Sequence, residues 1–161
     1  MAVTSIGRAR FVTVIKKARF VYSPFTSQEM VGFGDALAAT IRQRTQAGQN
    51  VYDQPAAPLK PGRNGRPGYP DRKRQRGIDP VRNWTWTGHT LRCLKTTSAN
   101  QNRAVIEFLN ETFPGRSQTA AQIASYNNQR EHQFGVSPRD RDYIIALMMS
   151  GRKLVTLQRM A

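Results

Sequence analysis

Residues 26–48, TSQEMVGFGDALAATIRQRTQAG, carry a long helical pattern around which the rest of the fold can be placed. Thr26 and Glu29 have the spacing of a capping box, in which each side chain accepts a hydrogen bond from the other residue's backbone N–H. Apolar residues follow at three- and four-residue steps, as on one face of a helix: Met30, Phe33, Leu37 and Ile41. The pattern predicts a helix that runs to about Gln46 and is terminated by Gly48, which follows it.

Two glycines, Gly32 and Gly34, lie in the first turns of this predicted helix. Glycine weakens a helix because it loses more backbone freedom on folding than other residues. Its missing side chain also lets another backbone approach closely. Both interpretations follow from the sequence.

The segments on either side predict strands and shorter helices. Residues 10–22 are rich in β-branched and aromatic residues, which favours a strand pair or one long strand, although their apolar residues also fit helical spacing. We also expect a short helix or turn around 91–94, a strand over 103–109, helices over 117–127 and 138–150, and a last strand over 153–157. The sequence therefore predicts an α+β fold: a small antiparallel sheet packed with two to four helices, plus a long Pro/Gly/Arg-rich extended loop.

Length and charge restrict the classes of function. The chain has 161 residues, which predicts a single domain over 1–161. Twenty-five basic residues stand against 10 acidic ones, a net charge of +15, and Arg outnumbers Lys 19 to 6. Such an excess favours polyanions or acidic protein surfaces as partners, and guanidinium groups suit both phosphates and carboxylates.

Several classes of protein are excluded or disfavoured. No apolar run reaches the 18 or more residues that a membrane-spanning helix needs. The N-terminus lacks a signal-peptide pattern, so we expect a protein that is not secreted. The single cysteine, Cys93, excludes an intrachain disulfide, and with only two histidines an all-protein structural zinc site is disfavoured. The sequence predicts no cofactor and no metal.

The segment 49–82 differs from the rest of the chain. It contains six prolines and four glycines and shows no apolar periodicity. A loop of this length is usually functional or disordered, so it is either a solvated tract or an arm that docks on DNA or on neighbouring subunits. Its basic residues, the candidate interaction site, are Lys60, Arg63, Arg66, Arg72, Lys73, Arg74, Arg76 and Arg82. Trp84 and Trp86 follow it at strand spacing and would either share a buried face or stack on bases.

No catalytic constellation stands out. Nothing in the local sequence indicates that Cys93 meets a histidine. Asp140 and Asp142 lie two residues apart in a predicted helix and therefore point in different directions. Ser137 is the predicted N-cap of that helix, with Pro138 at its first position, so Asp140 is interpreted as a first-turn acid worth at most about 1 kcal/mol.

Short motifs resemble those of a family of tailed-phage virion morphogenesis proteins, which includes tail-completion and head–tail joining (neck) proteins. The similar stretches are 57–61 (APLKP), 72–77 (RKRQRG), 86–92 (WTGHTLR), 124–128 (ASYNN), 133–140 (QFGVSPRD) with Ile144 and Ile145, and the helix end 41–48 (IRQRTQAG). The likeness spans about residues 30–149, and the first thirty residues match nothing in the family.

The resemblance implies a ring-forming protein at the junction between portal and tail, without enzymatic activity. Its partners would be portal or adaptor proteins, tail proteins and further copies of itself, with packaged DNA as a further contact. It would be made in the host cytoplasm and reside in the virion. From the residues themselves, we expect turn or cap geometry at Gly88 and Gly135 and core positions for Leu91 and Phe134.

Two alternatives remain at this point. The basic loop would also suit a non-enzymatic nucleic-acid-binding protein, such as a DNA-packaging or ribosome-associated protein, because phosphate contacts supply most non-specific affinity. A nuclease that uses Asp140 and Asp142 is a more distant alternative.

Overall fold

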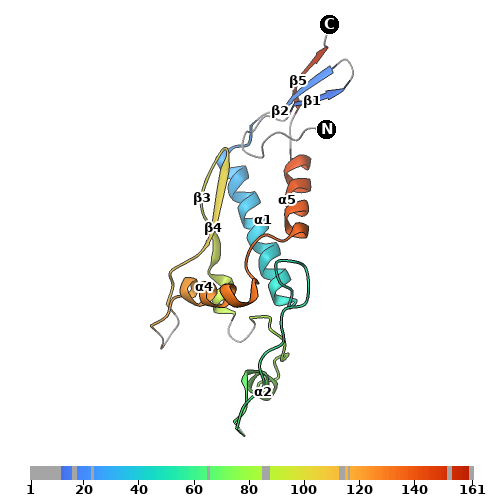
Figure 1. The fold of residues 1–161 in the computed structure, drawn as a ribbon. Coiled ribbons are helices and arrows are strands. Elements are labelled where there is room, and N and C mark those ends of the chain that lie inside the picture. The colour runs from blue at the N-terminus through green and yellow to red at the C-terminus, as the bar shows by residue number, and fades with distance from the viewer. Residues whose placement is uncertain are drawn as a thin grey trace.

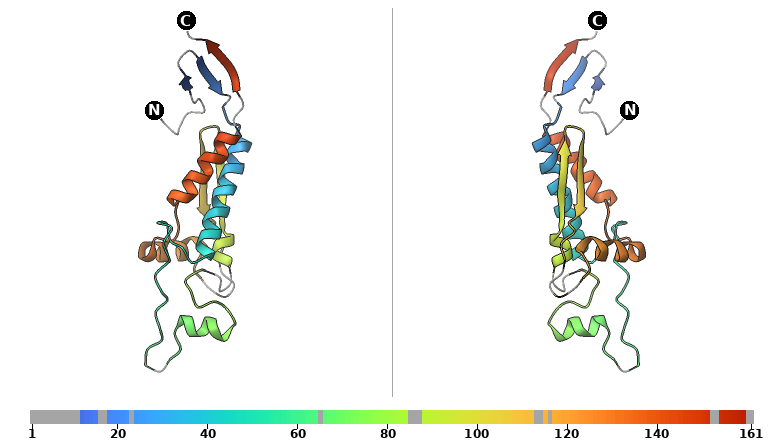
Figure 2. Two further views of the ribbon diagram at one scale, coloured as in Figure 1. Left: turned by 90° about the vertical axis from the view of Figure 1, so that its right-hand side faces the viewer. Right: turned by 90° about the vertical axis from the view of Figure 1, so that its left-hand side faces the viewer.

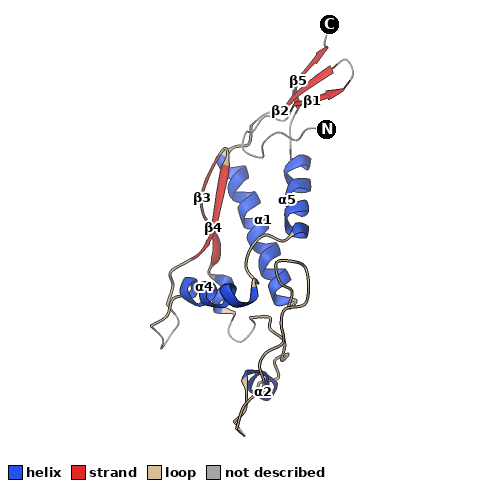
Figure 3. Cartoon of the chain, in the orientation of Figure 1, coloured by secondary structure: helices blue, strands red, loops and turns tan. Residues whose placement is uncertain are grey.

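The computed structural model describes residues 12–15, 18–22, 24–64, 66–84, 88–112, 115, 117–151 and 154–159. The fold is α+β, as predicted (Figures 1 and 3). In chain order the elements are β1 (Val12–Ile15), β2 (Ala18–Tyr22), α1 (Ser27–Gln46), α2 (Tyr69–Gln75), α3 (His89–Arg92), β3 (Leu94–Asn100), β4 (Arg103–Phe108), α4 (Ala120–Glu131), α5 (Pro138–Ser150) and β5 (Leu154–Arg159). The helices α1, α4 and α5 fall within the expected number, and the short α2 and α3 add to it.

Helix α1 has the predicted ends. The Glu29 N–H donates to Thr26 Oγ1 over 3.1 Å, and the Thr26 N–H donates to Glu29 Oε2 over 2.7 Å, which completes the capping box. After Gln46 the chain leaves the helix, and Gly48 adopts a φ of +75°, which favours glycine.

Helix α1 lies between the β3–β4 hairpin and α5 (Figures 1 and 2). The hairpin lies directly against the helix at Gly34, where an added Cβ would lie 2.6 Å from Thr96 Oγ1. At Gly32 an added Cβ would meet nothing within 4 Å. The predicted close approach therefore occurs at Gly34 alone, and it involves side chains of the hairpin.

Two hydrophobic clusters meet at one aromatic ring. The first joins α1 to β3 through Ala38, Ile41 and Leu94. The second joins α3, α4 and the loop before α5 through Leu91, Ala124 and Phe134. Phe108, at the end of β4, packs against both clusters, and its ring centroid lies 4.8 Å from that of Phe134. The two clusters therefore form a continuous core.

Strand β3 differs from the sequence-based expectation. A short helix forms at α3, as predicted for this region, but residues 94–100 pair with β4 as an antiparallel hairpin, from Leu94 opposite Phe108 to Asn100 opposite Arg103. Only the first residue of the strand is buried, so its polar sequence, LKTTSAN, shows no alternating pattern. Pairing with the well-predicted β4 determines this strand.

A second, three-stranded antiparallel sheet has the order β1-β2-β5. It confirms the strand pair predicted within residues 10–22 and the last strand, with Phe20 opposite Leu157. This sheet lies at the end of the molecule opposite α2 (Figure 1). Among the described helices, none combines the length and the apolar character needed to cross a membrane.

Candidate assembly interface

The segment 49–82 divides into a part that belongs to the body and a part that projects from it. Residues 49–56 are held by backbone hydrogen bonds from the Val51 N–H to the His132 carbonyl, 2.9 Å, and from the Ala56 N–H to the Gly48 carbonyl, 2.7 Å. Residues 57–82 leave the body, turn, and return through α2 (Figure 2). We call residues 57–82 the basic arm.

The tip of the arm is closed by two glycines. A Cβ added at Gly62 would collide with the backbone of Arg66, and one added at Gly68 would collide with the backbone of Gly62. Beyond this contact the Gly68 N–H donates to Asp71 Oδ2 over 2.8 Å, at the start of α2. The outgoing and returning chains therefore meet at positions where only glycine fits.

Lys73 anchors the arm, contrary to its predicted role as an exposed contact. Its side chain is 1% exposed, and its Nζ donates to the Val81 carbonyl and to Asn83 Oδ1, both over 2.6 Å. Burial lowers the pKa of this ammonium group from its ordinary value, and nearby Asp79 opposes the shift. Lys73 thus joins α2 to the returning chain, so it belongs to the fold of the arm and not to its contact surface.

The other basic residues of the arm face outward, except Arg82. The exposed ones are Lys60, Arg63, Arg66, Arg72, Arg74 and Arg76. Arg74 pairs with Asp71 over 2.9 Å on the surface, where such pairs contribute little. The half-buried Arg82 donates from Nε to the Ala57 carbonyl over 3.0 Å and closes the base of the arm.

A cleft of about 830 Å³ lies between the arm and the body. Both apolar and cationic side chains line it: Leu59, Lys60, Tyr69, Lys73, Val81, Arg82, Asn83, Trp84, Ile123 and Asn127. Tyr69 and Val81 are also 45% and 43% exposed. The arm therefore exposes apolar side chains beside its guanidinium groups.

Gln133 fixes the root of the arm to the body. This side chain is fully buried, its Nε2 donates to the Arg82 carbonyl over 3.1 Å, and its Oε1 accepts from Trp84 Nε1. The Trp84 and Phe134 rings pack together, with their centroids 4.9 Å apart. The spacing of the two tryptophans had suggested a strand, but Trp84 has a φ of +58° and does not lie in one. Trp86 lies outside the described residues.

The residues singled out beyond the arm occupy the predicted positions. Gly88 has a φ of +65° and precedes α3, and Gly135 has a φ of +145° in the turn before α5. Leu91 and Phe134 are 1% and 8% exposed and belong to the core. Ser137 caps α5, with its Oγ accepting from the Asp140 N–H over 3.1 Å.

Asp140 has a larger role than the sequence predicted. It is 4% exposed, and its Oδ2 accepts both from the Ser137 N–H, 3.1 Å, and from Arg44 Nε, 3.0 Å. The Arg44 guanidinium also donates to the carbonyls of Gln133 and Gly135, over 3.2 and 2.7 Å. Asp140 is therefore half of a buried ion pair that joins α1 to α5. Asp142 is exposed beside Arg141, so the two carboxylates do not form a joint site.

Arg44 was missed in the sequence, although a signal exists. It lies three residues beyond Ile41 and seven beyond Leu37, on the apolar stripe of α1. A charged residue at such a position either lies at the edge of the core or is buried with a partner.

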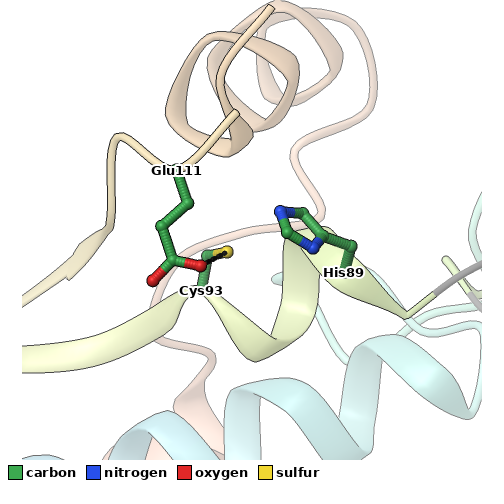
Figure 4. A group of neighbouring side chains, drawn as sticks. All are labelled: His89, Cys93 and Glu111. Carbon is green, nitrogen blue, oxygen red and sulfur yellow. Dashed lines mark hydrogen bonds between the residues drawn. The ribbon is translucent and has the colours of Figure 1, made fainter. Parts of the chain in front are cut away.

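A second cluster lies at the junction of α3 and β3 (Figure 4). One donor atom each from His89, Cys93 and Glu111 lies within 4.8 Å of the others. Cys93 Sγ donates to Glu111 Oε2 over 3.5 Å, and burial together with this carboxylate raises the pKa of the thiol. The structure thus places His89 near Cys93, a proximity that the sequence analysis did not anticipate. The four-residue step from His89 to Cys93, one turn of a helix, was the available signal.

Comparisons with known proteins found no match. The chain matches no family, no curated protein and no solved structure.

Proposed function

We propose that this chain is a non-enzymatic structural virion protein of the head–tail junction, a neck or tail-completion protein that forms a ring between portal and tail. The observation that carries this proposal is the basic arm, which projects from the body and exposes six of its eight cations. Its partners would be portal, adaptor or tail proteins and further copies of the chain. It would be made in the host cytoplasm, without secretion, and reside in the virion.

The way the arm is held supports a docking role over a solvated tract. A solvated tract would leave its lysines exposed to water. Lys73 is instead 1% exposed and makes two hydrogen bonds of 2.6 Å, which hold the arm in one conformation. The outgoing and returning chains are also held together at the tip, by the contact between Gly62 and Gly68, and at the base, by the hydrogen bond from Arg82 to the Ala57 carbonyl. An arm that is shaped before it binds loses less conformational entropy when a partner surface orders it.

The charge and exposure of the arm suit contacts between subunits. Exposed guanidinium groups contribute about 0–1 kcal/mol each in a free chain, and more when a partner removes them from water. In a closed ring every contact is repeated in each subunit, so a modest loss per subunit becomes a large loss per ring. The apolar side chains of Tyr69 and Val81 beside the cations are typical of a protein partner.

A nucleic-acid-binding protein is the second candidate. The observation in its favour is that only Asp71 and Asp79 oppose the eight basic residues between 60 and 82. Affinity of such an arm for DNA or RNA would fall steeply as salt rises, in proportion to the phosphates neutralised.

The test neutralises the arm without removing its anchor. Arg63, Arg66, Arg72 and Arg76 are changed together to Gln, and Lys73 is kept because it is buried. The variant replaces the natural chain during phage production, and finished particles, unjoined heads and unjoined tails are counted by electron microscopy. We expect an unchanged Tm and heads left without tails.

A matched control removes the same charge from the body. Lys95, Arg103, Arg139 and Arg141 are also exposed, and changing them to Gln lowers the net charge from +15 to +11, as the arm variant does. Normal particle yield with the arm variant would contradict the proposal. Salt-sensitive binding of the purified chain to DNA that the arm variant loses, together with normal joining, would establish the second candidate instead.

A further inference from the structure

We propose that His89, Cys93 and Glu111 form a binding site for one divalent zinc ion, with a water molecule as the fourth ligand. The three side chains supply nitrogen, sulfur and oxygen, the donor types that zinc accepts in proteins. Magnesium and calcium prefer oxygen donors alone, so the thiol and the imidazole favour a transition metal. The site goes beyond the proposed role in assembly and does not depend on it.

Three backbone hydrogen bonds hold the chain around these side chains in place. The Cys93 N–H donates to the His89 carbonyl over 3.2 Å, which puts both residues on one face of the α3 turn. The Leu109 N–H donates to the Cys93 carbonyl over 2.9 Å, and the Ala120 N–H donates to the Glu111 carbonyl over 2.8 Å. Two segments of chain are therefore fixed side by side before any ion binds.

The distances are close to those of a tetrahedral site. Ordinary zinc bond lengths put neighbouring ligand atoms roughly 3.3–3.6 Å apart. Cys93 Sγ and Glu111 Oε2 are already 3.5 Å apart, and all three donor atoms lie within 4.8 Å of one another. Glu111 is exposed and Figure 4 shows its carboxylate turned toward the thiol, so rotation of exposed side-chain bonds can close the remaining gap of about 1 Å.

Charge and solvent access also suit the ion. Cys93 as a thiolate and Glu111 as a carboxylate would balance the charge of Zn²⁺, with His89 neutral. Cys93 is 1% exposed, whereas His89 is half-buried and Glu111 is exposed. An ion would thus be shielded on the sulfur side and open to water on the carboxylate side. Bound there, it would tie α3 to the segment between β4 and α4.

The experiment measures zinc binding by the whole chain without an affinity tag. The chain is freed of metal with a chelator, and Zn²⁺ is titrated at pH 7.5 by calorimetry in two buffers that differ in ionisation enthalpy. We expect one ion per chain, release of about one proton from the Cys93 thiol per ion bound, and a higher Tm that the chelator reverses. Co²⁺ in place of Zn²⁺ should give the absorption of a thiolate-bound ion.

Variants at the three ligands and one control decide the outcome. His89→Gln, Cys93→Ser and Glu111→Gln should each weaken zinc binding at least tenfold, since second-shell changes alone cost about that much. Glu111→Gln is the decisive variant because this side chain is exposed and its loss should leave the metal-free Tm unchanged. His132→Gln removes the other histidine and should bind zinc as the natural chain does. Failure of the natural chain to bind zinc, undiminished binding by Glu111→Gln, or loss of binding in His132→Gln would each overturn the proposal.

Discussion

Changing Asp140 to Asn tests the buried ion pair most directly. The substitution keeps the size of the side chain and leaves an oxygen that can accept from the Ser137 N–H. It removes the negative charge from beside the Arg44 guanidinium, which is 6% exposed. The guanidinium would then be a buried cation without its carboxylate.

The expected cost follows from what remains around Arg44. Removing one partner of a buried pair typically destabilises a protein by about 3–5 kcal/mol. Three backbone carbonyls, of Gln49, Gln133 and Gly135, still accept from the guanidinium, which puts the cost at the lower end, about 3 kcal/mol. In a chain of this length such a loss lowers the Tm by roughly 6–12 °C. The first-turn position alone would account for at most about 1 kcal/mol.

Urea unfolding and thermal melting measure this cost. Asp142→Asn is the control, because Asp142 and Arg141 form a pair with 69% and 63% exposed side chains, which should contribute less than about 1 kcal/mol. The double variant Arg44→Met with Asp140→Asn should be clearly more stable than the sum of the two single losses predicts. A loss below about 1 kcal/mol for Asp140→Asn, or strict additivity in the double variant, would refute the reasoning.

Two further predictions concern α1 and Cys93. Gly34→Ala should destabilise the fold by about 1–3 kcal/mol, because its Cβ would press on Thr96, whereas Gly32→Ala, in open space, should stabilise it by up to about 1 kcal/mol. The two substitutions lie two positions apart in one helix. If urea unfolding showed that both change the free energy of unfolding in the same direction, the assigned packing would be contradicted. For Cys93, the folded pKa is raised above its ordinary value of 9.0, so the unfolded thiol loses its proton first and stability falls as the pH rises above 9. In the presence of chelator, Cys93→Ala should remove this part of the decline, and identical pH profiles for the two proteins would show that the thiol is not perturbed.

The helices could be predicted because their ends are encoded by neighbouring residues. Thr26 with Glu29, and Ser137 with Asp140, form capping boxes from side chains three positions apart. The α+β class followed from these ends together with the β-branched runs in β1, β2 and β4. These features depend on local spacing, which a single sequence displays directly.

The remaining features depend on contacts between distant parts of the chain. Lys73 counts as one more cation in a basic run until the arm turns and brings Asn83 to its Nζ. Glu111 lies eighteen residues from Cys93, and only the β3–β4 hairpin returns the chain to that point. Asp140 lies ninety-six residues from Arg44. The chemical role of each residue is decided by a partner that its own neighbourhood does not indicate.

Gln133 connects the basic arm to the core through hydrogen bonds on both sides. Its side chain holds the Arg82 carbonyl and Trp84 at the arm's root, while its own carbonyl accepts from Arg44, the residue that binds Asp140. One buried residue therefore links the root of the arm to the ion pair between α1 and α5. Any partner that bound the arm would in this way also fix the orientation of the body.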